Sequence, residues 1–78
     1  MTLPHEVLEE VGKELRLATS KHGPMKSAHE GYAVLLEEMD ELKAEVWRQH
    51  RDKMAMREEA LQVAAMATRF VIDVCGDD

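Results

Sequence analysis

The sequence predicts an all-α protein, a three-helix chain in a single domain of residues 1–78. Strong helix formers (Glu, Leu, Ala, Lys, Met and Arg) dominate the 78 residues. Aromatic residues make up only 4% of the chain, and β-branched residues are scarce before its C-terminal third. A chain of this length holds one domain, and it buries a small share of its surface when it folds alone.

The first helix is expected at residues 4–20. Pro4 suits the first turn of a helix, because the N–H that proline lacks needs no partner there. Leu8, Val11 and Leu15 then recur at helical spacing. The pair Gly23–Pro24 follows, and both residue types interrupt helices, so this helix should end just before them.

The second helix is expected at residues 28–49. Ser27 is followed three residues later by Glu30, which is the pattern of a capping box at a helix N-terminus. The apolar side chains that follow are spaced to form one stripe along a helix, and this stripe is expected to be buried. Its members are Leu35, Met39, Leu42 and Val46.

The third helix is expected at residues 53–74. Residues 47–62 contain neither Gly nor Pro, so local rules would also allow one helix of about 48 residues from 28 to 75. Such a helix is unusually long for a small globular protein. We therefore expect a turn at residues 50–53 with Asp52 as the N-cap, and Gly76 at the C′ position just beyond the last helix.

The third helix contains the run "ALQVAAMATRFVIDV", which is apolar over most of its circumference. A helix of this kind is normally surrounded by other helices. Two neighbours from one short chain can hardly cover it. We therefore expect a homo-oligomer, either a dimer or a tetramer.

The charge balance limits the classes of partner. The chain carries 10 basic and 16 acidic residues, a net charge of −6, which argues against binding nucleic acid by neutralising its phosphates. No stretch approaches the roughly 20 apolar residues of a membrane span, and the N-terminus lacks the apolar region of a signal peptide. The single cysteine, Cys75, excludes an intramolecular disulfide. We expect a soluble, cytoplasmic protein that binds neither nucleic acid nor membranes.

The second helix gathers carboxylates beside its apolar stripe. At about 100° per residue, Glu38, Glu41 and Glu45 fall within an arc of roughly 60°. The pairs Glu37–Glu41 and Glu41–Glu45 are like-charged at i, i+4, where repulsion destabilises a helix by a few tenths of a kcal/mol. A divalent cation would turn this repulsion into ligation. The alternative is a solvated acidic face.

A second polar stripe on the third helix contains Glu59, Gln62, Arg69 and Asp73. This stripe is either half of a metal site or the polar seam of a buried helix, with Glu59 or Asp73 paired to Arg69. A shared metal requires that the second and third helices form an antiparallel hairpin. In one continuous helix, Glu41 and Glu59 would stand about 27 Å apart.

The sequence resembles a known family at these two stripes. "EEMDE" at residues 37–41 and "EALQ" at residues 59–62 resemble the EExxE…ExxD pattern of the MazG-type all-α nucleoside triphosphate pyrophosphohydrolases. The resemblance extends over residues 23–73. It implies a MazG-like helical bundle that is completed by oligomerisation.

The resemblance also implies a chemistry. Members of this family hold Mg²⁺, for which Mn²⁺ can substitute, and they hydrolyse a nucleoside triphosphate to the monophosphate and pyrophosphate. By position, Glu38, Glu41 and Glu59 would be metal ligands. Gln62 stands where the family has its final Asp, and it offers a neutral carbonyl oxygen in place of a charged carboxylate.

Five further residues are candidates for the site. Glu45 and Asp73 are the candidates to replace the missing charge, Asp73 as a further ligand and Glu45 as a nearby carboxylate. Glu37 is the candidate to position water. Lys26 and Arg69 are candidates to contact phosphate, against the alternative that they are solvated or salt-bridged.

Three hypotheses remain open at this point. The first is a Mg²⁺-dependent nucleotide pyrophosphohydrolase that serves nucleotide housekeeping. The second is a catalytically weakened relative that binds a nucleotide or a protein partner without efficient turnover, which Gln62 motivates. The third is a structural helical oligomer whose acidic stripe is solvated.

Overall fold

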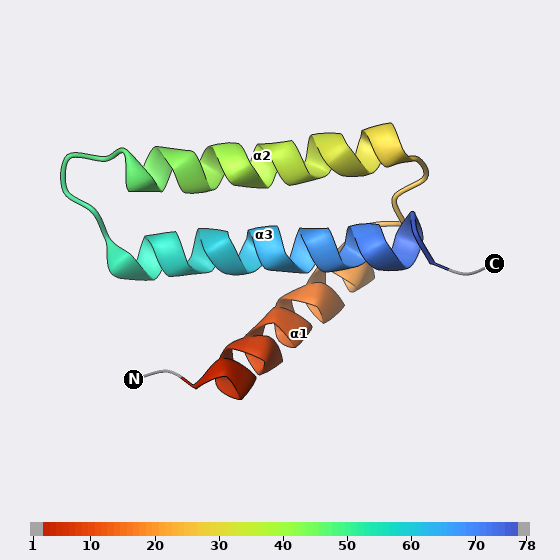
Figure 1. The fold of residues 1–78 in the computed structure, drawn as a ribbon, viewed down its shortest axis with the longest axis horizontal. Helices are drawn as coiled ribbons and strands as arrows, with labels where there is room; N and C mark the ends of the chain where they lie inside the picture. Colours follow the sequence, from red (N-terminus) through yellow and green to blue (C-terminus); the bar gives the residue numbers. More distant parts are fainter. Residues whose placement is uncertain (1–2, 77–78) are drawn as a thin grey trace.

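The computed structural model describes residues 3–76, and the all-α prediction is confirmed. These residues form three helices, α1 (Pro4–Lys21), α2 (Ala28–Val46) and α3 (Lys53–Asp73). α2 and α3 lie side by side and run in opposite directions, and α1 crosses α3 obliquely (Figure 1). α3 packs against both other helices. Within the described residues, no helix is long and apolar enough to cross a membrane.

α1 begins and ends within one residue of its predicted bounds. Pro4 occupies the first turn, and Leu3 precedes it without a side-chain cap. At the other end, the backbone N–H of His22 donates to the carbonyl of Ala18 at 3.0 Å. Gly23 and Pro24 then lie in the loop that leads to α2.

The N-terminus of α2 has the predicted cap in a modified form. Ser27 Oγ accepts a hydrogen bond from the Glu30 N–H at 3.0 Å. A capping box would have Glu30 accept from the Ser27 N–H. Instead, Glu30 Oε2 accepts from the N–H of Lys26 at 3.1 Å, one residue further back.

α2 ends at Val46, three residues before the predicted bound. The Nε–H of Arg51 donates to the carbonyl of Val46 at 2.8 Å. This bond satisfies one of the carbonyl groups that a helix C-terminus leaves without an intrahelical partner. A side chain from the following turn therefore helps to end the helix, which local composition does not reveal.

The N-terminus of α3 confirms Asp52 as the cap. Asp52 Oδ1 accepts from the N–H groups of Met54 at 2.9 Å and Ala55 at 3.3 Å. The prediction of Gly76 at the C′ position is wrong, because Val74 is the C-cap of α3 and Cys75 therefore takes the C′ position. A Cβ at Gly76 would instead overlap the carbonyl oxygen of Ile72, so this position needs glycine for close backbone approach.

The core is small and lies where α1 ends and α2 begins, against the C-terminal half of α3. The contact of α2 with α3 depends on Gly31, where an added Cβ would stand 2.6 Å from the ring of Phe70. The buried face of α2 is turned relative to the predicted stripe, because Met39 is 48% exposed whereas Glu38 is half-buried. The buried core residues are Ala18, Met25, Ala65 and Met66, with Val34, Leu35, Phe70 and Val74 packed against them.

Candidate metal centre and adjoining pocket

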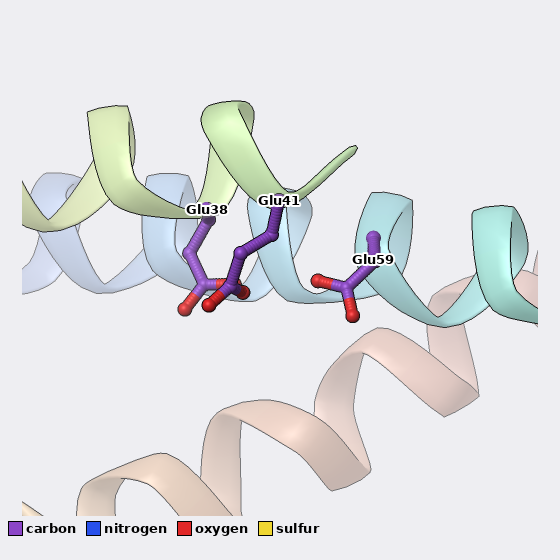
Figure 2. Close-up of side chains that lie close together, drawn as sticks. All are labelled: Glu38, Glu41 and Glu59. Atoms are coloured by element: carbon purple, nitrogen blue, oxygen red, sulfur yellow. The ribbon is translucent and has the colours of Figure 1, made fainter. Parts of the chain in front are cut away.

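Three carboxylates from two helices meet in the structure. Glu38 and Glu41 lie one turn apart on α2, and Glu59 lies on the neighbouring turn of the antiparallel α3 (Figure 2). One carboxylate oxygen of each residue lies within 4.8 Å of the others. Oxygen atoms at such spacing can share one divalent cation.

Two oxygen atoms of this cluster lack a polar partner. Glu38 Oε2 and Glu59 Oε2 are closed off from solvent and have no hydrogen-bond partner among residues 3–76. A buried polar atom without a partner costs free energy, so such atoms are rare in folded proteins. A bound cation would satisfy both atoms at once. The donor set therefore fits Mg²⁺ or Mn²⁺, which prefer a few carboxylate oxygens and complete their shell with water or phosphate.

The pKa values of Glu38 and Glu59 are those of carboxylates whose negative charge has no positive partner nearby. Burial raises the pKa of Glu38 to about 7, and the adjacent Glu41 and Glu59 carboxylates contribute to the rise. Burial also raises the pKa of Glu59, with Glu41 as the next cause. Both shifts reflect the cost of holding negative charge there without a positive partner. A cation would lower the pKa of both groups.

A pocket adjoins the carboxylate cluster. It is lined by residues of α1, α2 and α3 and of the loop between α1 and α2. Its volume is about 710 Å³, within the range of small-molecule sites. Glu38 belongs both to the pocket wall and to the carboxylate cluster. The wall carries groups of both charges, including Glu14, Lys21, Lys26, Glu37, Glu38 and Arg69.

Two other predicted site residues, Gln62 and Glu45, have partners of their own. Gln62 Nε2 donates to Glu14 Oε2 of α1 at 2.5 Å. Glu45 forms an ion pair at 3.0 Å with Arg48, which lies two residues beyond the end of α2. The structure thus places Gln62 in the pocket wall and Glu45 beside a cation that follows α2 in the chain.

Asp73 lies at the far end of α3, about 21 Å along the helix axis from Glu59. Its Oδ2 accepts from the N–H of Met25 at 2.9 Å and lies 3.9 Å from the Arg69 guanidinium. In this structure Asp73 therefore holds the loop between α1 and α2, away from the carboxylate cluster.

The two residues predicted to contact phosphate, Arg69 and Lys26, differ in their exposure. Arg69 is only 5% exposed, and its Nη2 donates to the carbonyl of Gly23 at 2.7 Å, so it supports the loop from beneath. Lys26 and Glu37 are exposed and line the pocket. Of the two cations, Lys26 has the side chain that a ligand in the pocket could reach.

Glu14 is the functional candidate that sequence reasoning missed. It lies on α1, 48 residues from Gln62, and enters the pocket only because α1 packs on α3. A helical spacing of i, i+4 on α1 does relate Glu14 to Glu10, which forms an ion pair with Arg57 of α3. In the structure both residues lie on the side of α1 that faces α3, but their spacing alone shows only that they share one face of the helix.

Comparison of the chain with protein-family models, with curated proteins and with solved structures finds no match.

Proposed function

We propose that the protein is a divalent-cation-dependent hydrolase of the MazG type, which converts a nucleoside triphosphate to the monophosphate and pyrophosphate in the cytoplasmic nucleotide pool. The observation that carries the proposal is the convergence of Glu38, Glu41 and Glu59 with two buried, unpartnered oxygen atoms. The pocket of about 710 Å³ beside Glu38 supplies the space for a nucleotide.

The chain's own residues would bind and orient the substrate. Glu38, Glu41 and Glu59 would hold Mg²⁺ or Mn²⁺, which neutralises phosphate charge and activates water for attack on phosphorus. Lys26, exposed in the pocket wall, would contact phosphate oxygens. Glu37 in the same wall would orient the attacking water and accept its proton.

The active form would be a homo-oligomer, a dimer or tetramer, in which two α2–α3 hairpins complete a MazG-like bundle. Tyr32, Leu36 and Met39 are 63%, 46% and 48% exposed and recur at helical spacing on α2. Val71 on α3 is 61% exposed. On the helical wheel, the exposed apolar stripe of α2 lies at least about 100° from Glu38 and Glu41. A second copy could cover it and leave the pocket open.

The deciding experiment incubates the protein with a panel of ribo- and deoxyribonucleoside triphosphates in Mg²⁺ or Mn²⁺. Pyrophosphate and the matching monophosphate should appear in equal amounts from at least one substrate, and EDTA should stop the reaction. The variant Glu59→Gln should lose most of the activity, because it removes a ligand charge. Glu9→Gln, at an exposed position of α1, is the matched control. Absence of hydrolysis across the whole panel would refute the proposal.

A second candidate function is binding without efficient turnover. The observation in its favour is Gln62, whose amide contacts Glu14 where the MazG-type pattern has Asp. If the loss of that carboxylate limits catalysis, Gln62→Asp alone should raise the rate of pyrophosphate release or the affinity for Mn²⁺. A variant with unchanged rate and affinity counts against this candidate.

A further inference from the structure

The pocket has two chemically different ends. Its floor follows α3 from Gln62 through Met66 to Arg69, about 10 Å by the helical rise. Glu38 lies at the Gln62 end, because its carboxylate joins the cluster with Glu59, one turn before Gln62. The loop between α1 and α2 forms the other end, beside the C-terminal part of α3 (Figure 1). A ligand in the pocket therefore has the carboxylate cluster at one end and this loop at the other.

Arg69 is a buried cation at the loop end whose charge is only partly neutralised. Its side chain is 6% exposed and belongs to the pocket wall. Nη2 donates to the carbonyl of Gly23 at 2.7 Å, but the acceptor for Nη1 is the thioether of Met66 at 3.7 Å, and a thioether is a weak acceptor. The Asp73 carboxylate lies 3.9 Å from Nη2, and the same oxygen accepts from the N–H of Met25. Burial of a charge without close partners costs free energy, so an anion in the pocket would stabilise this guanidinium.

Two lysines bring further positive charge to the loop end. Lys21 is the last residue of α1, and Lys26 lies in the loop just before α2. Both are exposed and line the pocket, and within residues 3–76 neither forms an ion pair with a carboxylate. Glu30 is the acidic residue at this end, and it already accepts from the backbone N–H of Lys26. With Arg69 included, the loop end of the pocket carries a net positive charge.

We propose that the loop end of the pocket binds the two terminal phosphates of a nucleoside triphosphate. Lys21 and Lys26 contact the phosphate oxygens by charge-assisted hydrogen bonds, and Arg69 adds fixed positive charge from the floor. The Nη1 of Arg69 lies beside Met66, which stands about 10 Å from Glu59 along α3. An extended triphosphate can bridge this gap when a metal bond holds one end and hydrogen bonds hold the other. The inference rests on the proposed function for the identity of the ligand, and it adds the direction in which the ligand lies.

The test is titration calorimetry with sodium pyrophosphate alone, in EDTA, on the full chain. EDTA removes divalent cations, so the heat of binding reports on the loop end and not on the carboxylate cluster. Lys21→Gln/Lys26→Gln should weaken binding by about tenfold, the scale of one charge-assisted hydrogen bond. The matched control is Lys13→Gln/Lys53→Gln, which removes the same charge from exposed positions outside this pocket and should bind as the wild type does.

Arg69 is observed without substitution, because its bond to Gly23 holds the loop in place. Pyrophosphate should shift the Nε–H resonance of Arg69 in proton–nitrogen correlation spectra. The Nε–H of Arg51, which donates to the carbonyl of Val46 outside the pocket, is the internal control and should not shift. A nucleoside triphosphate should displace pyrophosphate in EDTA, whereas the matching monophosphate, which lacks the two terminal phosphates, should not.

The outcomes separate this inference from the proposed function. A wild type that binds no pyrophosphate at millimolar concentration in EDTA would overturn the inference, even if the protein hydrolyses a triphosphate. Equal losses in the two double variants would also overturn it, because binding would then follow net charge and not the pocket. The same holds for a triphosphate that fails to displace pyrophosphate, or for binding that leaves the Arg69 resonance unmoved. If all these results are as expected but no triphosphate is hydrolysed, the phosphate site stands and the proposed function fails.

Discussion

Glu38 is the residue at which the stability of the fold should depend on pH. Its pKa in the folded chain is about 7, raised from an ordinary value of 4.5 first by burial and then by Glu41. The folded state therefore favours the protonated form. The stabilising contribution is complete below pH 4.5 and is lost as the pH rises through about 7.

We expect a lower free energy of unfolding at about pH 8 than at about pH 5 when EDTA removes divalent cations. Urea denaturation at the two pH values measures the difference. Glu38→Gln, which cannot ionise, should flatten it. Millimolar Mn²⁺ should restore stability to the wild type at the higher pH, because the cation replaces the proton. A Glu38→Gln variant with the full wild-type pH dependence would assign the effect to another group.

Gly31 is the residue that sets the distance between α2 and α3. Gly31→Ala should destabilise the protein by about 1–3 kcal/mol, because the new Cβ would press on the Phe70 ring. Gly12→Ala is a matched control in α1, where the Cβ would meet only the end of Arg16 at 3.5 Å. That variant should be stabilising by about 0.5–1 kcal/mol, from helix propensity. Urea denaturation would show opposite shifts, and equal shifts would contradict this account.

At the scale of the elements, the turn between α2 and α3 depends on Asp52. Asp52→Ala leaves the N–H groups of Met54 and Ala55 without their side-chain acceptor. It should cost about 1 kcal/mol of unfolding free energy, measured by urea denaturation. Asp52→Asn keeps an acceptor and should stay close to the wild type. An Asn variant as unstable as the Ala variant would show that the charge of Asp52 matters more than its hydrogen bonds.

The helices could be predicted from local signals wherever the capping group is local. Ser27 and Asp52 stand directly before the helices that they cap, so composition and spacing identified both N-termini. The end of α2 could not be found in this way. Arg51 reaches back five residues to the carbonyl of Val46, and arginine at that position carries no recognisable signal. The role of Gly76 could not be found in this way either, because it depends on close approach to the carbonyl of Ile72, which only the fold reveals.

At the scale of the whole molecule, the carboxylate cluster could be predicted and the pocket could not. Glu38 and Glu41 are related by the spacing of one helix, and Glu59 required only that a turn separate α2 from α3. Glu14 joins the pocket through a bond between residues 48 positions apart. No periodicity along the chain records how α1 lies on α3. The three clustered carboxylates can thus be predicted from the sequence, whereas the pocket wall that α1 contributes cannot.

Self-association is the prediction that belongs to the whole molecule. Sedimentation velocity should show a dimer or tetramer, and Leu36→Glu should shift it toward the monomer by placing a charge in the apolar face of α2. Leu8→Glu is the control, since Leu8 is 69% exposed on α1. That control should keep the assembly of the wild type. A wild type that sediments as a monomer at every concentration would contradict the expected oligomer.

The way α1 is attached has a consequence for the order in which the protein folds and opens. Hydrogen bonds from α1 and its following loop to α3 join residues 46 to 48 positions apart, whereas α2 and α3 are adjacent in the chain. Closing the longer loops costs more chain entropy, so the α2–α3 hairpin should form first and α1 should dock last. In native-state hydrogen exchange, the amides of α1 should then exchange through a partial opening that spares the hairpin. During such openings Glu38, Glu41 and Glu59 would stay together while the pocket beside them is lost.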